Sequence, residues 1–212
     1  NQGFAWDLAT FGNWLDSISA RGLDAYDYDQ TINYPPVFAD ILVMLTWLGD
    51  AFGVHPISLI KAPSILADLG IAALLAFGGK KWFSARTGLV AAFAFCFVPV
   101  IWYDSAIWGQ VDSLAALPML AAIFFLIEKK PEWAIVLFVI AVLTKPQGAL
   151  ALFVILPVLI GQVIGGEITR KRFATSVIAG AVTFTVIAVP WSLEAFAPRG
   201  VADVPVVGDL VG

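Results

Sequence analysis

The chain has 212 residues, of which 60% are hydrophobic and only 13% are charged. Since a soluble domain carries roughly a quarter charged residues, this composition excludes an ordinary soluble domain and indicates an integral membrane protein. The net charge is −4, and we expect no nucleic acid among the partners. The single cysteine, Cys96, excludes a disulfide within the chain, and the single histidine, His55, excludes a multi-histidine metal site.

The apolar segments predict membrane-spanning helices rather than barrel strands, because apolar and polar residues do not alternate within them. Several approach or exceed the roughly 20 residues that cross a bilayer as a helix. We expect an all-α integral membrane protein with about six transmembrane helices, plus interfacial helices in a large outer loop. The apolar runs, in chain order, are 36–53, 57–78, 88–103, 113–128, 133–144, 148–166 and 174–194.

Three gaps between these runs are basic, and together they hold eight of the twelve lysine and arginine residues. The other gaps are acidic or nearly neutral, so charge alternates along the chain as the positive-inside rule describes. We therefore expect the basic gaps in the cytoplasm of a multi-pass protein of the cytoplasmic membrane, with its active face extracytoplasmic. The basic residues are Lys80, Lys81 and Arg86, then Lys129 and Lys130, then Arg170, Lys171 and Arg172.

This topology predicts an extracytoplasmic loop with juxtamembrane helices over 1–56, a transmembrane helical bundle over 57–194 and an extracytoplasmic segment over 195–212. Residues 36–53 follow a Tyr-Pro-Pro turn and contain two aspartates. We expect them to form a helix that lies on or dips into the outer surface. Residues 1–35 resemble a loop that follows a membrane helix, and no signal peptide precedes them, so we interpret the chain as a fragment of a longer protein.

Residues 133–166 separate two basic gaps and must therefore cross the membrane an even number of times. Residues 133–144 alone would rise about 18 Å, which is short of a roughly 30 Å hydrocarbon core. Pro146 removes a backbone donor and breaks the helix at this point. We expect a hairpin whose turn, from Lys145 to Gly148, lies at or below the outer interface.

Asp7 is the first candidate for chemistry, because an ionisable group at membrane depth is costly and is a functional candidate by default. It shares a helical face with Phe4, Phe11 and Trp14. A carboxylate beside rings that pack on a sugar suits a general base. The alternative is an acidic residue on an interfacial amphipathic helix.

The richest polar cluster is the segment 102–113, which joins two predicted spans on the outer side. Asp104, Trp108, Gln110 and Asp112 are of residue types that stack on or hydrogen-bond a hydroxyl-rich ligand. The alternative is an aromatic belt in which Asp112 caps a helix.

Three further polar residues are suited to bind a phosphate near the interface: Lys145 and Gln147 in the proline-broken turn, and Lys61 near the outer end of its predicted span. Lysines near helix ends also snorkel to lipid headgroups, which is the alternative for both lysines. Asp68 lies in the middle of a predicted span. We expect it to face the bundle interior and to pair with a polar neighbour, as a structural residue.

Five elements between residues 4 and 150 follow one another in a familiar order. They are Asp7 with its aromatic neighbours, Asn33-Tyr34-Pro35-Pro36, Lys61-Ala62-Pro63 with Asp68, Trp108-Gly109-Gln110-Val111-Asp112-Ser113, and Lys145-Pro146-Gln147. On these elements the chain resembles the GT-C membrane glycosyltransferases. Within them it looks most like bacterial and archaeal proteins related to the mannosyltransferase that adds the second mannose of the glycosylphosphatidylinositol anchor. Residues 151–212 match only as generic spans.

The resemblance implies transfer of a sugar, most often mannose, from a polyprenyl- or dolichyl-phosphate donor to a lipid-linked or protein acceptor. The transfer inverts the sugar carbon and takes place outside the membrane. Asp7 would be the base, with Asp112 as the second catalytic candidate. The substrate-binding residues would be Tyr34, Lys61, Asp104, Trp108, Gln110, Lys145 and Gln147.

The leaving group of such a reaction is already an activated phosphate, so one base and electrostatic stabilisation are enough and no redox cofactor is needed. We assign no metal-binding residues, and the sequence does not decide whether a divalent metal takes part. The competing class is a non-enzymatic membrane component, either a transporter of lipid-linked sugars or a subunit of a larger complex. Transport would place charges along a path at mid-membrane, whereas here they concentrate at the outer ends, with Asp68 as the main exception.

Overall fold

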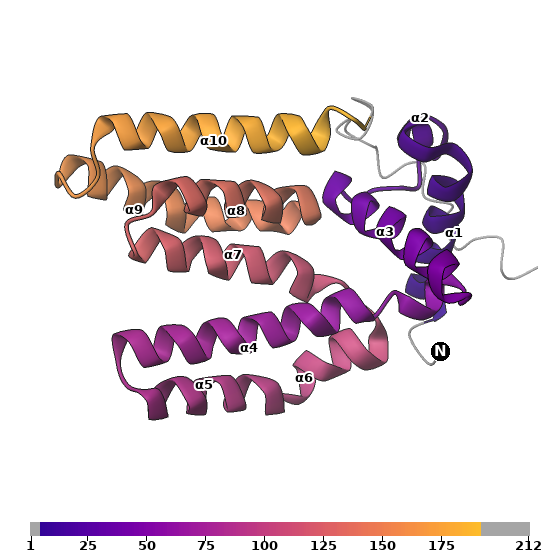
Figure 1. The fold of residues 1–212 in the computed structure, drawn as a ribbon, viewed down its shortest axis with the longest axis horizontal. Helices are drawn as coiled ribbons and strands as arrows, with labels where there is room; N and C mark the ends of the chain where they lie inside the picture. The colour runs from indigo at the N-terminus through magenta and orange to yellow at the C-terminus, as the bar shows by residue number, and fades with distance from the viewer. Residues whose placement is uncertain (1–4, 192–212) are drawn as a thin grey trace, which may run out of the picture.

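The structure, a computed structural model, describes residues 5–191 (Figure 1). Every element of regular secondary structure within this range is helical, which confirms the all-α prediction. The helices are α1 (Ala5–Arg21), α2 (Ala25–Tyr28), α3 (Pro36–Phe52), α4 (Ala62–Trp82), α5 (Ala85–Phe97), α6 (Pro99–Trp102), α7 (Asp112–Ile127), α8 (Pro131–Thr144), α9 (Leu152–Ile164) and α10 (Arg170–Ala188). Shorter pieces are η1 (Gly22–Asp24), η2 (Pro56–Leu59), the π-helical η3 (Tyr103–Trp108) and η4 (Pro146–Ala151).

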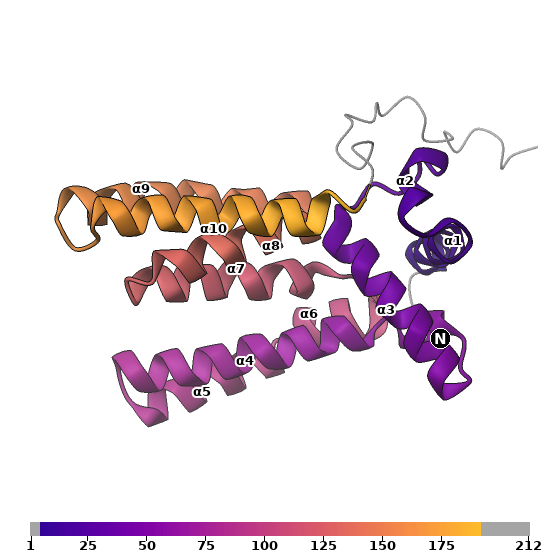
Figure 2. The same ribbon diagram turned by 45° about the horizontal axis from the view of Figure 1, so that its top comes forward.

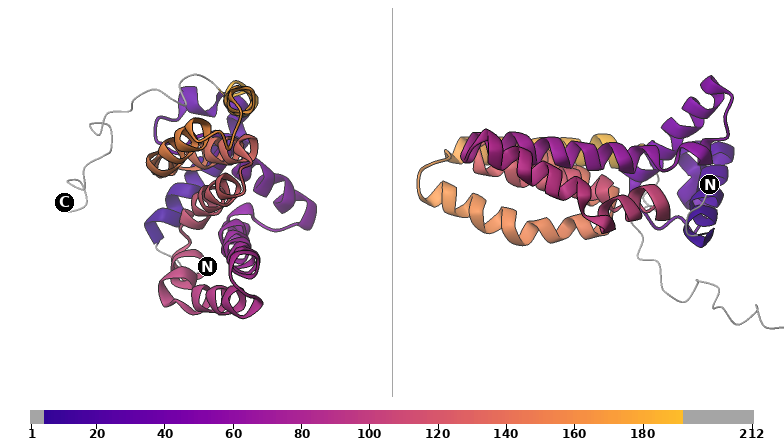
Figure 3. Two further views of the ribbon diagram at one scale, coloured as in Figure 1. Left: turned by 90° about the vertical axis from the view of Figure 1, so that its left-hand side faces the viewer. Right: turned by 90° about the horizontal axis from the view of Figure 1, so that it is seen from below.

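The long helices lie side by side in a bundle, and α1, α2 and α3 lie across one end of it, which we call the cap end (Figures 1 and 2). Figure 3 shows the bundle along its length, with α4 and α5 paired on one side, α8, α9 and α10 grouped on the other, and α7 between them. Phe4 and the predicted outer segment 195–212 lie outside the described residues.

Within the described residues, three stretches can cross a membrane by length and composition: Pro56–Trp82, Pro146–Ile164 and Arg170–Ala188. A fourth arises if α5 and Pro99–Trp108, which meet at a bend of 52°, form one broken span. The structure therefore supports three or four of the roughly six predicted spans. The other two expected spans, α7 and α8, are shorter apolar helices of 16 and 14 residues. Such helices rise only about 24 and 21 Å, less than a roughly 30 Å hydrocarbon core.

The helix break predicted after residue 144 is present, since α8 ends at Thr144 and η4 begins at Pro146. Helix α3 crosses the end of the bundle at a steep angle to the long helices and is not among the candidate spans (Figure 2). That α3 lies at the outer membrane surface stays a prediction.

The cap is held together by a buried aromatic cluster. Phe11 and Trp14 of α1 contact Tyr34 and Phe38 with ring centroids 5.3 to 6.2 Å apart. Such pairs contribute about 0.5–1.5 kcal/mol each beyond the burial of their area. Phe11 and Trp14 are 3% and 2% exposed, so their rings are buried in the core of the cap.

The cap is also tied to the C-terminal end of α10. The buried indole of Trp191 donates a hydrogen bond of 2.9 Å to Asp40 on α3 and packs edge-on against Tyr26 at 5.5 Å. Burial raises the pKa of Asp40, and the hydrogen bond from Trp191 acts in the opposite direction. The last long helix of the bundle is therefore anchored to the first helices of the chain.

Small residues allow the helices of the bundle to approach closely. A Cβ atom on Gly88 of α5 would lie 2.2 Å from the carbonyl oxygen of Ala76 on α4, and one on Gly180 of α10 would lie 2.5 Å from Ile135 on α8. Since only glycine fits at these two contacts, they fix how α5 packs on α4 and how α10 packs on α8.

The turns after α4, α7 and α9 lie together at the end of the bundle opposite the cap, which we call the basic end (Figures 1 and 2). The basic residues of all three gaps lie in these turns or at the adjoining helix ends. Ion pairs join neighbouring turns and helices there, and the pairs are Lys81 with Glu128, Lys129 with Glu167, and Arg172 with Glu132. The alternation of charge along the chain has thus become a separation of charge between the two ends.

We expect the two ends to lie on opposite sides of the membrane. In a Cys96→Ser background, Asp27→Cys at the cap end and Lys80→Cys at the basic end are both exposed positions. An impermeant maleimide added to intact cells should label Asp27→Cys, while Lys80→Cys should react only after permeabilisation. The Cys96→Ser protein serves as the unlabelled control, and labelling of both cysteines from the same side would contradict the topology.

Candidate functional site

The predicted site residues lie at the cap end of the bundle, where three parts of the chain meet. Helix α1 contributes Asp7, the stretch from η3 to the first turn of α7 contributes Trp108, Gln110 and Asp112, and the break between α8 and η4 contributes Lys145. These residues form two neighbouring groups, one around Asp7 and one around Lys145.

Asp7 receives two hydrogen bonds from residues more than 100 positions away. The indole nitrogen of Trp108 donates to Asp7 Oδ2 at 2.5 Å, and the amide nitrogen of Gln110 donates to the same oxygen at 3.0 Å. Within residues 5–191 the other oxygen, Oδ1, has no hydrogen-bond partner. The carboxylate is half-buried and oriented by two donors, and it keeps one oxygen available as an acceptor.

Gln110 also presents an unused acceptor. Its nitrogen faces Asp7, so its oxygen, Oε1, must point elsewhere. That oxygen is buried, and within the described part of the chain it has no hydrogen-bond partner. Since a buried polar atom without a partner costs free energy, this oxygen is a natural acceptor for a ligand hydroxyl.

The turn between Trp108 and Gln110 depends on a glycine. Gly109 has φ +92°, in the left-handed region that side chains disfavour. A Cβ atom there would lie 3.1 Å from Leu8 of α1 and 3.2 Å from the side chain of Lys61. Gly109 therefore permits both the backbone conformation and the close approach of α1 that brings Asp7 to its two donors.

Lys61 supports the same turn from below. Its ammonium donates hydrogen bonds to the carbonyl oxygens of Ala106 and Ile107, at 3.1 and 2.9 Å. The last carbonyls of a helix lack partners within it, so the lysine satisfies two of them and fixes the end of η3. The structure gives Lys61 a positioning role, and its predicted phosphate-binding role stays a prediction.

The second group centres on Lys145, which is 8% exposed. Its ammonium forms an ion pair with Asp112 and lies 5.2 Å from the centroid of the Tyr34 ring. Asp104 lies close enough to Asp112, Lys145 and Asp68 to interact with them electrostatically. The buried cation thus lies between the carboxylate of Asp112 and the face of one aromatic ring, with Asp104 close enough to interact with it.

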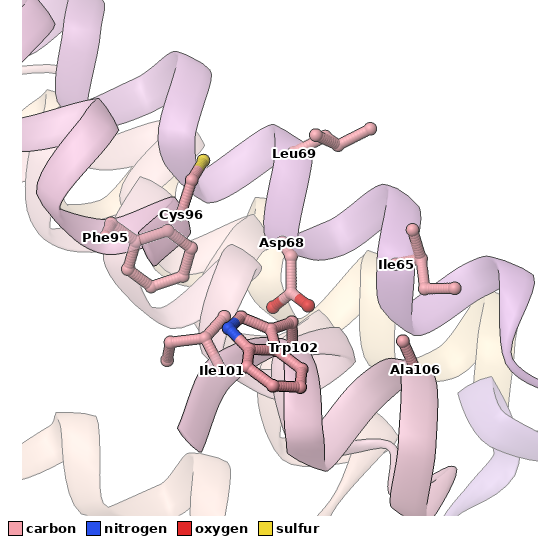
Figure 4. A pocket seen from close by; sticks show the side chains of 8 residues that line it. All are labelled: Ile65, Asp68, Leu69, Phe95, Cys96, Ile101, Trp102 and Ala106. Carbon is pink, nitrogen blue, oxygen red and sulfur yellow. The ribbon is translucent and has the colours of Figure 1, made fainter. Parts of the chain in front are cut away.

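Asp68 lies in the second turn of α4 and accepts hydrogen bonds from the hydroxyls of Ser105 and Ser113. This confirms that it pairs with polar neighbours inside the bundle. It also lines a cavity of about 150 Å³ between α4, α5 and the α6–η3 segment, where Figure 4 shows its carboxylate directed toward Trp102. Cys96 lines the same cavity, whose other walls are mostly apolar.

One sequence-based expectation differs from the structure. Phe11 and Trp14 cannot pack on a sugar beside Asp7, because both rings are buried in the cap. Gln147 is exposed, and no hydrogen bond within residues 5–191 joins it to Lys145, so its predicted phosphate-binding role stays a prediction. Nor do three His, Cys, Asp or Glu side chains of the described range come together as a metal site.

Sequence reasoning missed Ser105 and Ser113 as partners of Asp68. Both serines stand in the polar segment 102–113. Because a carboxylate in the middle of a predicted span requires hydrogen-bond donors, the hydroxyls of this segment could have been expected to pair with Asp68. It also missed the structural use of Lys61, because backbone carbonyls as partners leave no signal in the sequence.

Comparison with known proteins identifies one family. The profile of Glycosyltransferase family 87 matches residues 32–199, which is 168 of the 212 residues. No curated protein and no solved structure matches the chain. The matched range contains Tyr34, Trp108 and Lys145 but begins after Asp7, so Asp7 joins the site by its contacts and not by the family match.

We expect Gly109→Ala to distort the site far more than an alanine at another glycine. The left-handed backbone and the close contacts should lower the free energy of unfolding by about 1–3 kcal/mol and displace Trp108 and Gln110 from Asp7. Gly161→Ala is the matched control, since a Cβ atom there meets open space in the last turn of α9, and the stability of this variant should stay the same or rise slightly. Thermal unfolding in detergent and intrinsic tryptophan fluorescence measure both effects, and equal behaviour of the two variants would refute the constraint.

Proposed function

This chain belongs to glycosyltransferase family 87, a family of GT-C membrane glycosyltransferases, and we propose that it transfers a sugar from a polyprenyl- or dolichyl-phosphate donor to a lipid-linked or protein acceptor. We infer that the sugar is mannose and that transfer occurs on the outer side of the cytoplasmic membrane. The observation that carries this proposal is the carboxylate of Asp7, held by Trp108 and Gln110 with one oxygen left to accept a proton.

In the proposed reaction, the acceptor hydroxyl gives its proton to Asp7 Oδ1 as its oxygen attacks the anomeric carbon of the sugar. The new carbon–oxygen bond forms on the face opposite the phosphate. The bond from the anomeric carbon to the phosphate oxygen breaks, and the electron pair leaves with the lipid phosphate. Atoms and charge balance without a redox partner, and the configuration at the anomeric carbon inverts.

Lys145 is the proposed site for the donor's phosphate. An ammonium has three N–H groups, and Asp112 uses only part of this capacity. Asp112 and the ring of Tyr34 hold the cation in place, which reduces the ordering that phosphate binding requires. The negative charge that develops on the leaving phosphate would then meet a fixed positive charge.

The polar and apolar surfaces around these groups fit the other parts of the donor. The buried oxygen of Gln110 is suited to accept a hydrogen bond from a sugar hydroxyl next to Asp7. The 150 Å³ cavity beside Asp68 has apolar walls from Ile65, Leu69 and Ile101, which are suited to the first units of an isoprenoid chain. The donor would thus have its lipid within the bundle and its sugar beneath the cap.

We expect Asp7→Asn to reduce sugar transfer by about a hundred- to ten-thousandfold, the usual contribution of a general base. The substitution keeps the shape of the side chain and one acceptor for Trp108 and Gln110, so folding and donor binding should survive. The measurement is transfer from a radiolabelled polyprenyl-phosphate mannose by the full-length protein in proteoliposomes. Asp16→Asn, an exposed position on the same helix, is the matched control and should keep full activity. An Asp7→Asn variant with more than about half of the activity would move the base to Asp112.

We expect Lys145→Met to weaken donor binding about ten- to hundredfold. Methionine keeps much of the apolar stem, so the main loss is a charge-assisted hydrogen bond of roughly 1.5–3 kcal/mol. Binding of a polyprenyl-phosphate sugar to the full-length protein in nanodiscs measures the loss. Lys171→Met at the basic end removes the same charge far from the site and should leave donor affinity unchanged. Unchanged affinity in Lys145→Met would assign the phosphate to Lys61.

A further inference from the structure

The segment 106–112, which carries three of the candidate site residues, starts and ends at one buried point. Ser105 precedes the segment in η3, and Ser113 follows it in the first turn of α7. The hydroxyl oxygens of these two serines lie 3.4 Å apart. Ser105 is fully buried and Ser113 is 8% exposed. The segment is therefore a loop whose two ends are held side by side in the bundle.

The carboxylate of Asp68 holds this point from α4. Its Oδ2 accepts a hydrogen bond from the hydroxyl of Ser105, and its Oδ1 accepts one from the hydroxyl of Ser113. Each hydroxyl has one hydrogen, and the other acceptor near Ser105, the carbonyl oxygen of Ile101, is 3.3 Å away. Because an ionised carboxylate is the stronger acceptor, both serines direct their hydrogen to Asp68. Figure 4 shows Asp68 extending from α4 toward the α6–η3 segment.

Lys61 acts on the same segment from the same face of α4. It stands seven residues before Asp68, which is two helical turns or about 10 Å along the axis. Its ammonium binds the last carbonyl oxygens of η3, whereas the carboxylate of Asp68 binds a hydroxyl in the first turn of α7. A cation beside the end of one helix and an anion beside the start of the next both have the favourable sign. One face of α4 thus holds the segment with two opposite charges.

We propose that Asp68 is a positioning residue of the site, which keeps the base and the phosphate-binding cation aligned by holding both ends of the segment 106–112. Through Ser105 it fixes the helical segment that ends in the two hydrogen-bond donors of the base. Through Ser113 it fixes the residue that directly follows Asp112. A displacement of about 1 Å at such a site lowers a rate by about a hundredfold. The inference rests on the proposed function and adds a residue that acts on it from outside the site.

The test separates the stability that Asp68 supplies from the position that it sets. Asp68→Leu removes both acceptors of the serine hydroxyls, so it should lower both the melting temperature and sugar transfer. The triple variant that adds Ser105→Ala and Ser113→Ala should recover much of the melting temperature, because replacing all hydrogen-bonding partners by apolar groups is nearly neutral. Transfer from polyprenyl-phosphate mannose by the full-length triple variant in proteoliposomes should stay about tenfold or more below that of the unmodified protein.

Two further variants serve as controls. The amide of Asp68→Asn accepts a hydrogen bond from one serine and donates one to the other, so transfer should stay within about threefold of the unmodified protein. Ser64 lies one turn before Asp68 on α4 and is fully buried, and its hydroxyl has no hydrogen-bond partner within residues 5–191. Ser64→Ala therefore removes a buried hydroxyl from the same helix without removing a contact, and should change neither melting temperature nor transfer.

Hydrogen–deuterium exchange reports on the segment without any reaction. The amides of Gly109 and Gln110 donate to the carbonyl oxygen of Asp104 at 2.9 and 3.0 Å and should exchange slowly in the unmodified protein. Exchange over 105–113 should be about tenfold faster in Asp68→Leu and in the triple variant, and unchanged in Asp68→Asn. Unchanged exchange in the triple variant, or recovery of transfer together with its melting temperature, would overturn the proposal. An unmodified protein that transfers no sugar would instead overturn the proposed function, and exchange would still decide whether Asp68 holds the segment.

Discussion

The two hydrogen bonds from Lys61 to the carbonyls of Ala106 and Ile107 hold the end of the π-helical segment η3 against α4. Everything that surrounds Asp7 depends on where this segment ends. A π-helix leaves unpaired carbonyls at its C-terminus, and at membrane depth these would be costly without donors. Because Lys61 supplies the donors, the chain can turn sharply at Gly109 and direct Trp108 and Gln110 toward the first helix.

The cost of leaving polar groups unpaired inside the bundle also explains how charge is distributed over the molecule. Inside the bundle, Asp68 is satisfied by two serine hydroxyls, and Lys145 is satisfied by Asp112 and the face of Tyr34. At the basic end the ion pairs are mostly exposed, where such pairs contribute little to stability. The buried groups at the cap end therefore fix the geometry of the site, while the exposed charges at the basic end contribute little to it.

Much of this arrangement can be predicted from the sequence, and the remaining features cannot, for identifiable physical reasons. The helical class, the grouping of the basic gaps and the break before Pro146 follow from hydrophobicity, charge and proline chemistry. The number of spans does not, because α7 and α8 are each apolar but short, and length alone does not decide whether such a helix crosses. Periodicity placed Phe11 and Trp14 on the face of Asp7, but it cannot tell that α3 covers that face with Phe38. Contacts between distant residues, such as Asp7 with Gln110, can be expected only through the family resemblance.

The short stretch from Gln110 to Asp112 separates the two chemical tasks of the proposed reaction. Gln110 points toward Asp7, and two residues later Asp112 points toward Lys145, so one peptide segment positions the base on one side and the cation on the other. An inverting transfer requires this separation, because the attacking oxygen and the leaving phosphate occupy opposite faces of the anomeric carbon. A sugar held between them would also need a hydrogen-bond acceptor, and the buried oxygen of Gln110, which has no partner within residues 5–191, is suited to this role. The rigidity of this segment, set by Gly109 and by Lys61 beneath it, would then decide how well base and phosphate are aligned across the sugar.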